Sequence, residues 1–65
     1  MMGEIVDRLR VASDLLDKAR IEIEDAEVAI YQETGNFSKM TQSILADIWG
    51  VRCKVNILQQ DWSLR

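Results

Sequence analysis

The thiol of Cys53 is the most nucleophilic side chain in this 65-residue sequence, and the sequence contains no histidine. Without histidine, one chain cannot form a serine triad, a Cys–His pair or a histidine metal cluster. A reactive thiol needs a positive charge beside it, but Arg52 and Lys54 point to other sides of the expected helix. We therefore interpret Cys53 as a small buried hydrophobic side chain and expect no catalytic residue and no enzyme activity.

The densest acidic cluster is the next candidate for chemistry, and it contains Glu22, Glu24, Asp25 and Glu27. Carboxylate-bridged metal sites in helical bundles combine inward-facing glutamates with a Glu-x-x-His motif, and the histidine is missing. The four side chains also spread around the helix, so we interpret them as a solvated face. The three glycines have the wrong spacing for a phosphate-binding loop. The sequence therefore predicts neither a metal site nor a cofactor.

The first half of the chain has a heptad repeat, which predicts a helix over about residues 4–34. Large aliphatic residues occupy one column of the repeat, and alanines occupy most of the next. An alanine column lets a facing helix approach closely, and large residues of that helix can fill the space. The two columns are Met2, Leu9, Leu16, Ile23, Ile30 and Ile5, Ala12, Ala19, Ala26, Glu33.

A break at residues 34–38 separates this helix from a second one over about residues 38–62. Gly35 can adopt the left-handed conformation that ends a helix, and Asn36 or Ser38 can cap the next helix. A short turn makes consecutive helices antiparallel neighbours. We therefore predict an all-α fold, in which residues 1–65 form a single antiparallel two-helix hairpin.

The second helix has two apolar stripes on nearly opposite sides, at about 100° per residue. The first helix can cover one stripe, with Val51 near Ala19, Leu58 near Ala12 and Trp62 near Leu9. It cannot cover both, so the other stripe should be buried against another molecule, most simply a second copy. The stripe toward the first helix is Phe37, Ile44, Ile48, Val51, Val55, Leu58 and Trp62, and the expected interface is Ala46, Trp49, Cys53, Ile57 and Leu64.

The small size of the chain also predicts self-association. A chain of fewer than about 70–80 residues seldom has a sufficient core without a disulfide, a metal or a partner. One cysteine cannot form an intrachain disulfide. Residues 1–34 contain nine acidic and four basic residues, whereas residues 35–65 contain two and four, so the two helices attract each other and their copies. We expect a homo-oligomer, either a four-helix bundle or a higher helical oligomer.

The length, the mid-chain turn and the columns that mix alanine with leucine resemble the Rop-type antiparallel hairpin, which dimerises into a four-helix bundle and binds paired RNA loops. The resemblance implies a dimeric bundle and structured-RNA binding as one alternative function. Nucleic-acid binding usually needs clustered basic residues, and here they are dispersed. The sequence thus argues against a nucleic-acid partner. It favours a small regulator, inhibitor or adaptor that holds a larger macromolecule, a protein partner, by helix packing.

A second alternative is an oligomer that sequesters a small, nucleotide-like ligand in pockets between subunits. Such pockets would draw on Tyr31, Lys39, Arg52 and Lys54 from different subunits. The sequence has no apolar run long enough to span a membrane and no signal-peptide core, and its lone cysteine suits a reducing compartment. We therefore expect no membrane association and a cytoplasmic location.

Overall fold

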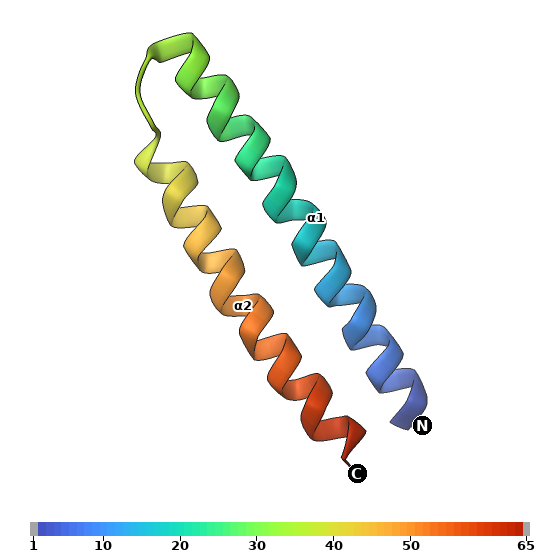
Figure 1. The fold of residues 1–65 in the computed structure, drawn as a ribbon. Helices are drawn as coiled ribbons and strands as arrows, with labels where there is room; N and C mark the ends of the chain where they lie inside the picture. The colour runs from blue at the N-terminus through green and yellow to red at the C-terminus, as the bar shows by residue number, and fades with distance from the viewer. Residues whose placement is uncertain (1, 65) are drawn as a thin grey trace.

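The protein folds as two long helices side by side, joined by one short turn, with both termini at the same end (Figure 1). The computed structural model describes residues 2–64, with side chains over 3–64. Helix α1 covers Met2–Thr34, helix α2 covers Lys39–Ser63, and no strand occurs in residues 2–64. The predicted all-helical fold with two helices packed against each other is confirmed. Neither helix carries an apolar stretch long enough for a bilayer crossing.

The turn is formed by the residues that the sequence indicates. Gly35 has φ +75°, the left-handed conformation that glycine adopts without strain, and its N–H donates to the Tyr31 carbonyl at 2.7 Å. The Thr34 hydroxyl donates to the Ile30 carbonyl at 2.8 Å, which closes the last turn of α1. Of the two expected caps, Ser38 is the one used, because its side chain accepts from the Thr41 N–H at 3.3 Å.

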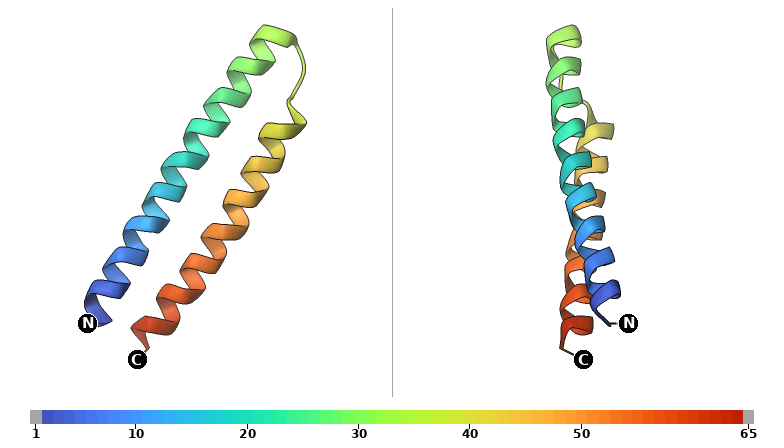
Figure 2. Two further views of the ribbon diagram at one scale, coloured as in Figure 1. Left: turned by 180° about the vertical axis from the view of Figure 1, so that it is seen from behind. Right: turned by 90° about the vertical axis from the view of Figure 1, so that its right-hand side faces the viewer.

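The hairpin is a thin, elongated slab, as the two views in Figure 2 show, with extents of 50 × 15 × 10 Å. Its radius of gyration is 15.2 Å, whereas a compact chain of this length would have about 10.7 Å. Its accessible surface is 5092 Å², compared with about 4,250 Å² for a compact monomer of this mass. The single chain therefore leaves about 850 Å² more surface in water than a compact fold of its size would.

The register of the two helices follows from one contact between them. The Thr41 hydroxyl donates to Glu27 Oε2 at 3.0 Å. The heptad repeat then fixes which residues pair along the line of contact between α1 and α2, which we call the seam. Trp62 accordingly lies beside Val6, with which it lines a small hollow at the open end of the hairpin. The columns that meet at the seam are Val6, Ser13, Arg20, Glu27 and Leu9, Leu16, Ile23, Ile30 on α1, and Thr41, Ile48, Val55, Trp62 and Leu45, Arg52, Gln59 on α2.

The predicted seam was only half right. The column of Leu9, Leu16, Ile23 and Ile30 does face α2, but its companion at the seam is the column containing Ser13, Arg20 and Glu27 rather than the alanine column. Ala19 and Ala26 are exposed, and Val51 and Leu58 stay nearly half exposed instead of being covered by α1. The side chain of Met2 lies outside the described residues. The alanine column lies beside the seam rather than in it, and Ser13 and Glu27 of the column that takes its place have polar partners on α2.

A seam built in this way forms no dry core. Most layers pair one apolar with one polar side chain, and none of the hydrophobic side chains in residues 3–64 is fully buried. Thr41 is the one buried residue within that range. Burial of apolar surface is the main driving force of folding, and the two helices of one chain bury less of it than a compact domain with a dry core would.

Candidate interaction surfaces

Besides the hydrogen bond of Thr41 to Glu27, two polar contacts between the helices lie along one broad side of the hairpin. Arg52 forms a two-point ion pair with Asp17, with Nε to Oδ1 at 2.7 Å and Nη2 donating to Oδ2 at 3.3 Å. One turn further along, the Ser13 hydroxyl donates to Asn56 Oδ1 at 3.2 Å. Within α1, Arg20 Nη1 lies 2.8 Å from Glu24 Oε1. These pairs place the polar partners of Arg52, Ser13 and Arg20 on this side of the seam.

We call this side the Trp49 face, and it contains an open groove of about 670 Å³. The Arg52 guanidinium lies over the Trp49 ring, 5.3 Å from its centroid, a cation–π distance. Both arginines of the groove have a carboxylate partner, so the groove carries balanced charge. Its lining residues are Asp17, Arg20, Glu24, Leu45, Ala46, Trp49 and Arg52.

The opposite broad side has a different composition. In an antiparallel pair, the columns just outside the seam on this side are the alanine column of α1 and the aliphatic column of α2. The alanine column contains only apolar residues from Ile5 to Ala26. The aliphatic column of α2 likewise contains only apolar residues from Ile44 to Leu58. We call this side the apolar face and define it by Ile5, Ala12, Ala19, Ala26, Ile44, Val51 and Leu58.

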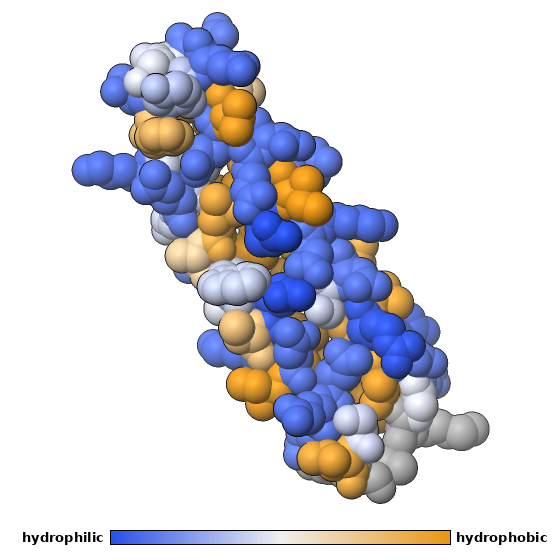
Figure 3. Space-filling view, viewed as in Figure 1, coloured by the Kyte–Doolittle hydropathy of each residue, from blue (hydrophilic) through white to orange (hydrophobic). Residues whose placement is uncertain are grey.

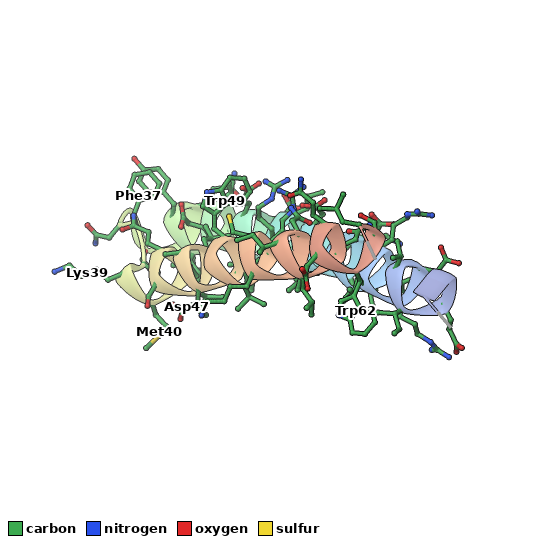
Figure 4. All side chains as sticks on the ribbon, turned by 90° about the horizontal axis from the view of Figure 1, so that it is seen from below. Phe37, Lys39, Met40, Asp47, Trp49 and Trp62 are labelled. Atoms are coloured by element: carbon green, nitrogen blue, oxygen red, sulfur yellow. The ribbon has the colours of Figure 1, made fainter. Side chains whose placement is uncertain are left out.

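Labelled side chains of α2 and of the turn before it project to opposite sides of the hairpin (Figure 4). Trp49 and Phe37 project to one side of the ribbon, whereas Trp62, Met40 and Asp47 project to the other. The side that carries Trp49 faces the viewer in Figure 3, where hydrophilic residues run along both helices with hydrophobic ones between them. Polar and apolar side chains thus share the Trp49 face, whereas the heptad pattern places the two apolar columns on the opposite side of the seam.

The predicted interface residues lie on the Trp49 side and the outer edge of α2. Trp49 is 55% exposed, Ile57 and Leu64 are more exposed still, and Ala46 and Cys53 are also exposed. As expected, α1 does not cover this stripe. The expected burial of Cys53 is not provided within its own chain. Whether another molecule covers these residues stays a prediction.

The four residues proposed for a ligand pocket do not come together in one chain. Arg52 is paired with Asp17, which lies fourteen residues, or about 21 Å of helix, from Tyr31. Tyr31 stacks on Phe37 at 4.6 Å between ring centroids. Lys39 and Lys54 are exposed elsewhere on α2. The stack of Tyr31 on Phe37 was missed by sequence reasoning, because Phe37 precedes α2 and does not follow its periodicity.

The acidic cluster also contains no metal site in the described part of the chain, where no three potential ligand side chains converge. Glu24 and Glu27 instead serve the hairpin as the partners of Arg20 and Thr41.

Comparison of the chain with models of protein families, with curated proteins and with solved structures finds no match.

Proposed function

We propose that this protein is a non-catalytic, homo-oligomeric interaction protein that acts as a small regulator, inhibitor or adaptor of a larger macromolecule. In this proposal, copies of the hairpin first associate into a helical bundle. The bundle then presents an exposed apolar stripe, centred on Trp49 and Ile57, to its target. Binding occurs by helix-against-helix packing with an aromatic anchor, and tryptophan is enriched at such energetic centres of interfaces.

One observation carries the proposal, namely a protomer with no buried hydrophobic side chain among residues 3–64. Exposed apolar surface on this scale is typical of interaction sites. The excess of about 850 Å² over a compact monomer is close to the ~800 Å² that each partner buries in a standard interface. A second contact surface is also available, since Trp49 and the column of Ile44, Val51 and Leu58 flank opposite sides of the seam in the heptad pattern of α2.

The two alternatives receive less support from the arrangement of charges. The groove beside Trp49 has the aromatic ring and the guanidiniums that a nucleotide-like ligand needs, but Asp17 and Glu24 already neutralise both arginines. Arg8 and Arg10 on α1 are likewise paired, with Glu4 and Asp7. An RNA site of the Rop type would need basic groups clustered for phosphate contacts, whereas Lys18, Lys39 and Lys54 are dispersed along the two helices.

The proposal is tested by mass measurement in solution combined with two binding screens. We expect an oligomer by light scattering, no thermal shift with a panel of nucleotides, and no binding of structured RNA at low salt. A folded monomer would refute self-association. A nucleotide that raises the unfolding temperature would favour the sequestering alternative, and salt-sensitive RNA affinity would favour the Rop-like one.

A further inference from the structure

We infer that a second copy of this chain covers the apolar face, with the turns of the two hairpins at the same end of the bundle. This inference rests on the proposed self-association and specifies its surface and its geometry. It leaves the Trp49 face on the outside of the dimer, where the target would bind.

The first reason is that the two broad sides differ in the free-energy cost of removing them from water. On the Trp49 face, Asp17, Asn56 and Glu24 are the polar partners of seam residues, and covering them would desolvate two ion pairs. On the apolar face, the columns outside the seam contain no polar group between Ile5 and Ala26 or between Ile44 and Leu58. Covering those columns removes apolar surface from water, and the charged side chain of Asp47, which projects to the same side in Figure 4, is exposed and lies outside them.

The second reason is area. The broad face of the slab is 50 Å long and 15 Å wide. A copy stacked on it would cover a patch close to the ~800 Å² per partner of a stable interface. The same contact would enclose the half-exposed side chains of Val51 and Leu58 and give the bundle the dry core that the protomer lacks.

The orientation follows from volume and charge. With the turns at the same end, α1 of one copy packs on α2 of the other, so that Ala19 faces the column of Ile44, Val51 and Leu58. With the turns at opposite ends, α1 would pack on α1 and α2 on α2, which places alanine against alanine and large residues against large ones. It would also place the acidic half of one chain, with nine acidic and four basic residues, against its copy. Large-on-small packing and opposite charge both favour turns at the same end.

Spin labels on exposed residues of α1 distinguish the two orientations. The label is attached at Gln32→Cys, near the turn, or at Lys18→Cys, halfway along α1, each in a Cys53→Ser background. With turns at the same end, both label pairs are separated by less than about 30 Å, since helix axes in a bundle lie 8–10 Å apart. With turns at opposite ends, the Gln32 labels are more than about 40 Å apart, because each lies fourteen residues from the centre. The Lys18 labels stay close in both cases and report the dimer itself.

The covered face is tested by the rate at which a disulfide reagent modifies a single thiol. We expect Cys53 in the wild-type chain to react at the rate of an exposed thiol. The thiol introduced by Ala19→Cys in the Cys53→Ser background should react at least about tenfold more slowly. This protection should disappear when dilution dissociates the dimer. A protected Cys53 with a reactive Cys at position 19 would assign the dimer interface to the Trp49 face. Long Gln32 distances with short Lys18 distances would overturn the orientation. Either result would leave the proposed self-association intact, whereas a monomer with no coupling between labels would refute both.

Discussion

Shortening one side chain on the apolar face should weaken the dimer, whereas the same change elsewhere should not. Val51 on α2 is 48% exposed in the protomer, and Val11 on the outer side of α1 is 57% exposed. Val51→Ala and Val11→Ala remove the same atoms from nearly equally exposed positions. The two variants differ in the side of the hairpin on which the change is made.

The size of the effect can be worked out from the exposed fraction. The substitution removes the equivalent of two methylene groups, each contributing about 0.8 kcal/mol when fully buried. The protomer leaves 48% of Val51 exposed, so about half of this, ~0.8 kcal/mol per chain, would come from the second copy. Two chains contribute ~1.6 kcal/mol, which corresponds to a roughly 15-fold higher dissociation constant. The gain in helix propensity from valine to alanine is common to both variants and cancels in the comparison.

The assay is sedimentation equilibrium of wild type, Val51→Ala and Val11→Ala over a dilution series. We expect the dissociation constant of Val51→Ala to rise by about one order of magnitude and that of Val11→Ala to stay within about twofold of wild type. Equal dissociation constants for all three proteins would refute the assignment of the apolar face. A larger effect for Val11→Ala would place the contact on the outer side of α1.

Three further changes test the association and the turn. Raising the protein concentration 100-fold should stabilise a dimer by about 2.7 kcal/mol, which raises the midpoint of thermal unfolding by roughly 10 °C for a pair of chains of this length. A midpoint independent of concentration would exclude coupling between folding and association. Gly35→Ala should lower the free energy of unfolding in urea by about 1 kcal/mol because φ is +75°, whereas Gly50→Ala, in open space within α2, should raise it by up to about 1 kcal/mol. Ser38→Ala should cost about 1 kcal/mol through the lost cap of α2, and Ser43→Ala, at an exposed position in the second turn of α2, should not; equal losses would rule out the cap as the cause.

The helices and the turn could be predicted from the sequence because their signals are local. The repeat of Leu9, Leu16, Ile23 and Ile30 reports one helix face directly. Gly35 marks the end of that helix through backbone conformation alone. No long-range information is needed for either inference.

The seam could be predicted only in part, because its second column depends on pairing in three dimensions. By type, Arg20 and Glu27 belong on a solvated surface, and Ala19 belongs against a neighbouring helix. The structure reverses these roles, since Glu24 lies beside Arg20 and Thr41 donates to Glu27. Heptad columns on either side of an aliphatic column are equivalent in a single helix, and the partner decides between them.

The surfaces could be predicted to a similar degree. The spacing of Trp49, Cys53 and Ile57 indicated correctly that α1 leaves these residues exposed. The basic and aromatic residues suggested for a ligand pocket were chosen by type alone. Tyr31 and Arg52 lie far apart along the hairpin, a separation that only the register reveals.

The central claim is that one hairpin is an incomplete fold that a second copy completes. The most direct measurement is the mass of the wild-type protein in solution, by sedimentation equilibrium or native mass spectrometry, with helicity recorded by circular dichroism on the same samples. We expect a helical species of twice the chain mass of 7.5 kDa that loses its helicity as dilution dissociates it. A 7.5-kDa monomer that stays fully helical at every concentration would contradict the claim.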